Sequence, residues 1–327
     1  MREGKELILA TKEFAKEIRW KSWYHTITTL LLLIGSIAGT LLFPWLWARL
    51  LCSVFAALML SRFFIIFHDY QHHTILHRSK AAKVIFTIFG FYMLTPPSIW
   101  KRSHDHHHKH NAKLFSASIG SYPIMTRQKY LETSKKERFG YLALRHPLNM
   151  FFSYITVFLY GMCFRSFISN PSRHWDSLAV ILVHLGISAF LLIQFGWATL
   201  IITFLLPFFL SHMLGAYLFY AQHNFPGVVF RNNKDWNYTK AALESSSYMK
   251  MNPFMQWVTA NIGYHHIHHL NARIPFYRLP EAMEKLPELQ QAKTTDLSPA
   301  EIIRCLRLKV WDPEQNRMIG FREMGGR

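Results

Sequence analysis

Long apolar runs alternate with polar, histidine-rich segments along this chain of 327 residues. A helix that crosses a bilayer needs about 20 predominantly apolar residues. Four stretches reach that length, at about residues 26–43, 46–67, 177–195 and 197–220. Pro44 separates the first two stretches and Gly196 separates the last two, so the pattern predicts two helical hairpins with tight turns.

Two further apolar stretches, 81–100 and 148–168, are predicted to lie along the membrane interface. Thr95-Pro96-Pro97 interrupts the first of them. Basic residues crowd the segment that follows the second span, whereas the two hairpin turns carry almost none. The positive-inside rule therefore predicts that both termini and the central segment are cytoplasmic. If only one extra stretch crossed, the histidines after the second and fourth spans would face opposite sides of the membrane.

Composition supports a membrane protein. Half of the residues are hydrophobic and only 17% are charged, whereas soluble domains carry about 25% charged residues. With such apolar runs, the net charge of +18 suits an anionic membrane face better than nucleic acid. We predict an all-α integral membrane protein with interfacial helices and a cytoplasmic cap. Its predicted parts are a cytoplasmic or interfacial N-terminal segment (1–24), a membrane domain (25–280) and a cytoplasmic tail (281–327).

The 19 histidines are not spread evenly but form clusters just beyond the predicted spans. Residues three or four apart share one face of a helix, and three clusters have this spacing. With one histidine after the fourth span, the convergent set is His68, His72, His104, His107, His108, His223, His265, His268 and His269. His106 and His110 point away from His104. Nine imidazoles exceed the capacity of one ion, and imidazole suits iron, zinc, copper and nickel, so the pattern predicts a two-metal centre.

A metal-bound imidazole needs a partner for its second nitrogen, and Asp69, Asp105 and Asn261 lie beside the clusters. We expect these three residues to orient the ligands. A metal transporter is the non-enzyme alternative, but transporters place their ligands near the bilayer midplane, whereas these histidines follow the span ends.

One polar group falls deep within the fourth predicted span. His212 precedes His223 by eleven residues, so both face the same side, with His212 roughly 16 Å deeper. A polar residue at that depth faces protein or a cavity. We expect Ser211, His212 and Gly215 to line a substrate tunnel, with a buried hydrogen bond between spans as the alternative.

The ordered segments HDYQHH, WKRSHDHHH, QH and NIGYHHIHHL resemble the three histidine boxes of the membrane fatty acid desaturases. The resemblance extends from about Phe63 to Leu279 and is greatest to the acyl-lipid (Δ12/ω3-type) branch. It implies that the nine histidines bind two iron ions, which use O2 to introduce a double bond into a lipid-linked acyl chain. It also implies a separate electron donor, a ferredoxin or a cytochrome b5-like protein.

Two positions depart from the family patterns. The first box reads HDYQH where acyl-lipid relatives commonly have HDCGH. Phe219 stands where the acyl-CoA branch has an asparagine that holds a metal-bound water. These departures bear on the branch and argue against the acyl-CoA type. Related hydroxylases and carotenoid ketolases or hydroxylases also carry such boxes, so they are the alternative enzymes. The expected location is a bacterial inner membrane, with the endoplasmic reticulum as the alternative, because neither a transit peptide nor a retrieval signal is evident.

Overall fold

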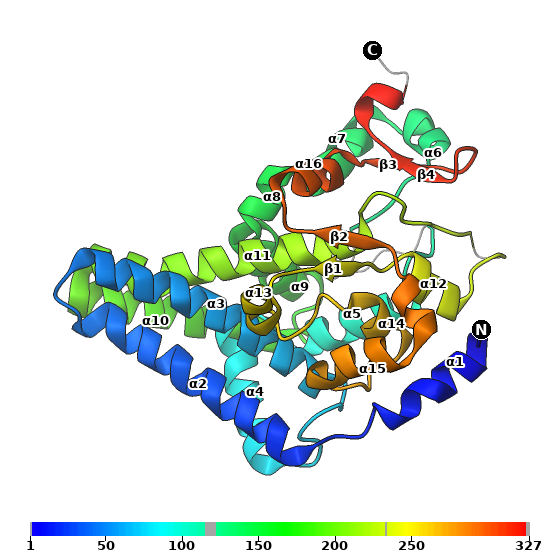
Figure 1. Cartoon of the computed structure of the whole chain (residues 1–327). Helices are drawn as coiled ribbons and strands as arrows, with labels where there is room; N and C mark the ends of the chain where they lie inside the picture. The colour runs from blue at the N-terminus through cyan, green and yellow to red at the C-terminus, as the bar shows by residue number, and fades with distance from the viewer. Residues whose placement is uncertain (1, 115–121, 233, 325–327) are drawn as a thin grey trace.

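The computed structural model describes residues 2–114, 122–232 and 234–324, and these are mostly helical. Long helices project from one end of a mixed region of short helices, strands and loops, which holds the first and the last described residues (Figure 1). The long helices are α2 (Arg19–Leu42), α3 (Leu46–Gln71), α10 (Trp175–Leu200) and α11 (Leu206–His223), with the π-helix η3 (Ile201–Leu205) joining the last two.

Helices α2 and α3 form the first hairpin. Phe43 leaves the helical conformation, with ψ of 136°, directly before Pro44, and α3 begins two residues later. The two helices approach closely at Gly39, where an added Cβ would lie 2.6 Å from Cys52 Sγ. Helix α2 starts at Arg19, seven residues before the predicted span. The helix thus includes a polar N-terminal stretch that an apolar criterion leaves out.

The second hairpin turns at Gly196. Its φ of 78° and ψ of 176° are outside the range of ordinary L-residues and break the helix there. The rings of His184 and Phe204 lie 4.7 Å apart between centroids. In a straight helix, these residues would be about 30 Å apart. The chain therefore folds back at Gly196, as the sequence predicts.

Among the described residues, three helical segments are long and apolar enough to cross a membrane: Arg19–Leu42, Leu46–Gln71 and Trp175–His223. The third includes the Gly196 break. A fourth crossing is possible if α4 (Lys80–Tyr92) and α5 (Pro97–Lys109) together count as one span, although they meet at 94°. Counted in this way, the described helices give three segments, or four with the bent pair.

The two stretches predicted to be interfacial form short or bent helices. Pro97 is the first residue of α5 and accounts for the break from α4, because proline lacks the N–H that a continuing helix needs. The second stretch contains the π-helix η2 (Tyr154–Phe164) and α9 (Arg165–Ser169). Together they form an apolar helix of 16 residues, from Tyr154 to Ser169, which is short for a span.

The prediction of an all-α fold is corrected by two small sheets. Strand β1 (Tyr248–Lys250) pairs in parallel with β2 (Thr294–Asp296), and β3 (Val310–Asp312) pairs antiparallel with β4 (Arg317–Ile319). Three-residue strands carry too little alternation to be recognised in a sequence. The C-terminal part of the chain is thus joined to the body of the protein by strand pairing.

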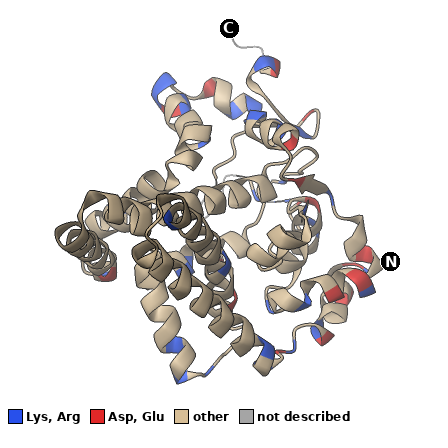
Figure 2. Cartoon of the chain, turned by 60° about the vertical axis from the view of Figure 1, so that its left-hand side comes forward, with Lys and Arg blue, Asp and Glu red and all other residues tan. Residues whose placement is uncertain are grey.

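Short helices complete the cap and the N-terminal segment. Their bounds are α1 (Gly4–Ala10), α6 (Arg127–Glu132), α7 (Lys135–Leu144), α8 (Pro147–Phe151), α12 (Tyr238–Glu244), α13 (Pro253–Val258), α14 (His265–Leu270), α15 (Leu279–Lys285) and α16 (Pro299–Arg307), with 3₁₀ turns η1 (Thr11–Glu13), η4 (Phe276–Arg278), η5 (Pro287–Gln291) and η6 (Phe321–Glu323). Leu7 and Phe14 are buried in the main core, which anchors the N-terminal segment. Charged side chains gather on these short elements rather than on the long helices (Figure 2).

Candidate metal centre

The histidine clusters lie on three helices and at the end of a fourth, and these helices meet where the long hairpins join the cap. His68 is in the last turns of α3, and His72 follows as its C-cap. The second cluster lies on α5, the third on α14, and His223 ends α11. Helices α5 and α14 lie close together beside the end of α3 (Figure 1). Four segments that are distant in sequence therefore converge on one site.

The first ligand group contains five imidazoles, whose candidate ligand atoms all lie within 4.8 Å of one another. Its members are His68, His72, His104, His108 and His268. His104 Nε2 lies 2.9 Å from His72 Nε2 and 3.1 Å from His108 Nε2. His268 Nε2 lies 3.1 Å from His108 Nε2. All three histidine boxes thus contribute to this group.

The second ligand group contains four imidazoles under the same 4.8 Å limit: His107, His223, His265 and His269. His265 Nε2 lies 2.8 Å from His223 Nε2 and 3.1 Å from His269 Nε2. His107 Nε2 lies 3.2 Å from His269 Nε2. The two groups touch, because the rings of His108 and His269 stack with centroids 4.3 Å apart. The nine predicted ligands therefore form two adjacent groups.

The chemistry of these nitrogens fits metal binding. Burial, with smaller contributions from neighbouring imidazoles, lowers the pKa of the box histidines on α5 and α14 well below 6.5, so they are neutral at pH 7: His104, His107, His108, His265, His268 and His269. A neutral imidazole offers a lone pair to a metal. In each group, contacts of 2.8–3.2 Å link four Nε2 atoms, which cannot all be satisfied by protons between pairs, whereas one shared cation satisfies the group.

Asp69 and Asn261 both form hydrogen bonds with the backbone of Phe276, beside the first group. Asp69 Oδ2 accepts a hydrogen bond of 2.8 Å from the backbone N–H of Phe276, and its Oδ1 lies 3.5 Å from His68 Nδ1. Asn261 Nδ2 donates to the carbonyl of Phe276 at 3.1 Å. Asp69 thus lies beside His68, whose Nδ1 makes no hydrogen bond among the described residues, whereas Asn261 supports the segment that follows the third box.

Asp105, the third residue predicted to orient a ligand, forms an ion pair with a lysine. Its carboxylate pairs with Lys101 at 2.8 Å, one helical turn earlier, and is 40% exposed. The i,i+4 spacing of the two residues explains this contact.

Three contacts that support the ligands were not predicted from the sequence. His223 Nδ1 lies 3.1 Å from the carbonyl of Ser245, which leaves Nε2 free for a metal. The indole ring of Trp100 stacks on His104, with centroids 5.0 Å apart and an interplanar angle of 12°. Tyr238 donates to the carbonyl of His269 at 2.7 Å. Only Trp100 had a sequence signal, because it precedes His104 by one helical turn.

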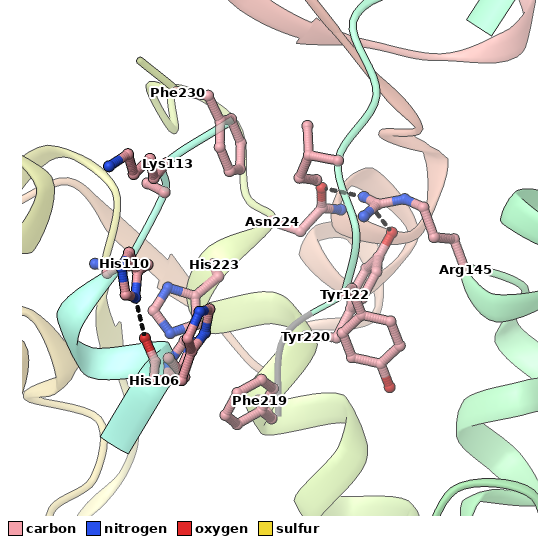
Figure 3. Close-up of a pocket in the computed structure, with 14 residues that line it drawn as sticks. His106, His110, Lys113, Tyr122, Arg145, Phe219, Tyr220, His223, Asn224 and Phe230 are labelled. Carbon is pink, nitrogen blue, oxygen red and sulfur yellow. Dashed lines mark hydrogen bonds between the residues drawn. The ribbon is translucent and has the colours of Figure 1, made fainter. Parts of the chain in front are cut away.

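A pocket opens beside the second group (Figure 3). His107 and His223 are among the residues that line it, together with Phe219. The Phe219 ring lies 4.9 Å from the ring of His107 between centroids. Arg145, fully buried at another wall, donates to Asn224 Oδ1 at 2.6 Å and ties the end of α11 to the cap. The second group is therefore reached through a pocket with an aromatic wall.

The predicted tunnel residues lie deeper along α11. Ser211 Oγ is 3.1 Å from Ser61 Oγ on α3, and His212 Nδ1 is 2.7 Å from the carbonyl of Phe208. Both side chains are buried. A Cβ added to Gly215 would meet no atom within 4 Å, so open space adjoins this position.

Comparison with known proteins identifies the family. Residues 44–297 match the model of the family described as fatty acid desaturase. The chain is 31% identical over 271 residues to a fatty acid desaturase of Bacillus subtilis, covering 83% of this chain and 76% of that protein. It is 22% identical over 282 residues to the sn-1 oleoyl-lipid 12-desaturase of Synechocystis, covering 85% and 79%. It is also 24% identical over 252 residues to the sn-1 acyl-lipid omega-3 desaturase (ferredoxin) of Nostoc, covering 75% and 67%. The chain therefore belongs to the fatty acid desaturase family.

Proposed function

We propose that this protein is an O2-dependent desaturase that introduces a double bond into a lipid-linked acyl chain. The observation that carries the proposal is the pair of adjacent imidazole groups, with five and four histidines, at the end of long apolar helices. The relatives named as acyl-lipid and oleoyl-lipid desaturases support an acyl chain attached to a glycerolipid as the substrate.

The proposed cofactor is a pair of iron ions, one in each ligand group. When bound, the irons would supply the oxidising power needed to remove two hydrogen atoms from adjacent CH2 groups. The overall reaction takes two electrons and two hydrogen nuclei from the substrate, two electrons from a donor and two protons from water, and reduces O2 to two molecules of water. The protein's own part is to hold the imidazoles in place, through Asp69 at the first group and the Ser245 carbonyl at the second. Burial of the box histidines keeps bulk water from the reacting atoms.

The proposed membrane arrangement has four spans in two hairpins, α2/α3 and α10/α11. Both termini and the histidine boxes would be on the cytoplasmic side, and a bacterial inner membrane is the proposed location. The low density of charge at the turns at Pro44 and Gly196 supports this orientation. In this arrangement 1–24 and 281–327 flank the membrane domain at 25–280, and the substrate head group stays at the interface.

We further propose that the acyl chain passes near His212 of α11, whose ring packs against Phe158 of η2 with centroids 4.4 Å apart. The buried Ser61–Ser211 contact and the open space at Gly215 support a polar constriction followed by room for a chain. Replacement of His212 by alanine is expected to change the chain-length preference or the double-bond position in active enzyme. Unchanged products would reject the tunnel role and leave His212 as a structural residue.

The function is tested by expression in a bacterial host that makes no polyunsaturated lipids, followed by lipid profiling and location of the new double bonds. A His107→Ala variant serves as the inactive control. New alkenes that depend on His107 are expected. Oxygenated products without new alkenes would show a hydroxylase or ketolase instead. Metal analysis of the purified protein is expected to find iron at two ions per chain, and zinc at that stoichiometry would contradict the proposed cofactor.

A further inference from the structure

The first ligand group has one exposed edge. Four of its five imidazoles are buried, whereas His72 is half-buried. His72 Nε2 lies 2.9 Å from His104 Nε2 in the interior of the group. A molecule that rests against His72 is therefore separated from the metal position by a single imidazole.

Positive charge surrounds this edge. Burial lowers the pKa of the neighbouring His73 imidazole, and the nearby charges of Lys101 and Arg273 lower it further. The His73 and His77 rings lie 4.9 Å apart, and Arg19 donates to the carbonyl of His77 at 3.1 Å. We define the docking patch as Arg19, His73, His77, Lys101 and Arg273. These residues come from α2, α5, the loop after α3 and the loop after α14.

The acidic groups near the docking patch are already engaged. Asp105 pairs with Lys101 at 2.8 Å. Glu17 lies 3.4 Å from Arg19 Nη1 and accepts a hydrogen bond of 2.7 Å from the backbone N–H of Leu76. Three cations face two carboxylates here, so the patch keeps an excess of positive charge even with its imidazoles neutral.

The two ligand groups open in different places. The pocket adjoins the second group at His107 and His223. The docking patch borders the first group at His72 and is built from exposed and half-buried side chains. None of the five residues of the docking patch lines the pocket.

We infer that the docking patch binds an acidic one-electron carrier protein, which delivers electrons through the His72 edge. The inference rests on the proposed function, because the proposed reaction needs two electrons per O2 that the substrate does not supply. Each docking event passes one electron from the reduced carrier to the centre, so two events serve each turnover. Charge complementarity speeds encounter and fixes orientation at such surfaces.

The test measures direct binding, which does not depend on activity or on iron. The full chain is placed in nanodiscs of phosphatidylcholine, which has no net charge. Its affinity is then measured for two acidic probes, a plant-type [2Fe–2S] ferredoxin and the soluble domain of cytochrome b5. The variant carries Lys101→Glu and Arg273→Glu, and the matched control carries Lys135→Glu and Lys136→Glu, two exposed lysines on α7. A single Arg273→Glu variant checks that any loss is not caused by disruption of the Lys101–Asp105 pair.

We expect the patch variant to bind at least one probe about tenfold more weakly at low salt, with the α7 control unchanged. The difference should shrink as added salt screens the charges. Equal affinity of wild type and patch variant for both probes would overturn the inference, as would a larger loss in the α7 control. Lipid profiling after a single turnover separates the two proposals: wild type and patch variant are reduced with dithionite without O2, freed of the reductant and then given O2, which needs no docking surface. If the patch variant forms the unsaturated product and also binds the probes normally, only the docking patch is rejected. If wild type forms no unsaturated product, the proposed function is rejected.

Discussion

The two ligand groups differ in number and in support. The first has five imidazoles, on α3, α5 and α14, and a carboxylate, Asp69, lies beside it. The second has four imidazoles, one of them at the end of α11, and a backbone carbonyl, Ser245, holds that one. Phe219 occupies the space one turn before His223, where it offers no ligand atom. The second group is thus the less saturated one and the one beside the pocket.

This difference teaches that nine similar residues need not have one role. A metal with fewer protein ligands keeps open positions for exogenous molecules. In the proposed enzyme, the second group would therefore face O2 and substrate, whereas the first group, closed by five imidazoles, would face the electron donor. The following predictions test this division, from the largest expected effect to the smallest.

Acid should destroy both groups together. The pKa values of the buried box imidazoles are lower in the folded protein than the value of 6.5 in the unfolded chain, so below pH 6.5 the unfolded state binds more protons. The free energy of unfolding of the metal-free protein should therefore fall as the pH drops below 6.5, by up to about 1.4 kcal/mol per pH unit for each such imidazole. Denaturation at pH 7.5, 6.5 and 5.5 measures this. Constant stability from pH 6.5 to 5.5 would contradict the prediction.

Removal of one ligand should affect only its own group. His107→Ala is expected to lower iron content from two ions per chain to one and to reduce desaturation more than about 100-fold, since even residues that merely support a ligand contribute 10- to 100-fold. His104→Ala should remove the other iron. Iron analysis and product quantification test both variants. Loss of both irons in each variant would show that the groups are not independent.

Asp69→Asn should weaken the first group without emptying the second. The amide cannot stabilise the His68 imidazole as a carboxylate does, so metal affinity at this group should fall by about 10- to 100-fold. Metal titration measures the effect. Asp105→Asn is the matched control, because Asp105 pairs with Lys101. Equal losses in the two variants would remove the special role of Asp69.

Phe219→Asn should make the second group more like the first. The new amide oxygen lies one helical turn before His223 and can bind the metal directly or through a water. We expect tighter metal binding at this group and a reduction in turnover of about two- to tenfold, because an open position is filled. Absorption spectroscopy of the cobalt-substituted protein reports the added ligand. An unchanged spectrum would show that Phe219 is too far from the metal to matter.

Helical spacing explains why so much of the centre can be predicted from the sequence. His104, His107 and His108 share one face of α5 for purely local reasons, and the same holds for the third box on α14. Apolar length and the breaks at Pro44 and Gly196 likewise predict the four long helices. The division into groups of five and four was not predictable, because His107 and His108 are adjacent in sequence and yet belong to different groups.

The sequence by itself determined the apolar helices, their turns and the nine imidazoles, because helix period, hydrophobic length and the special backbones of proline and glycine are properties of neighbouring residues. Only the tertiary structure decided which imidazole meets which. It also decided that the backbone N–H of Phe276 donates to Asp69, 207 residues away, and that the carbonyl of Ser245 supports His223. These contacts join segments far apart in the chain, and a backbone carbonyl carries no signal in the residue type that bears it. The sheet of β1 and β2 had to come from the fold for the same reason, since β1 pairs with a strand more than forty residues away.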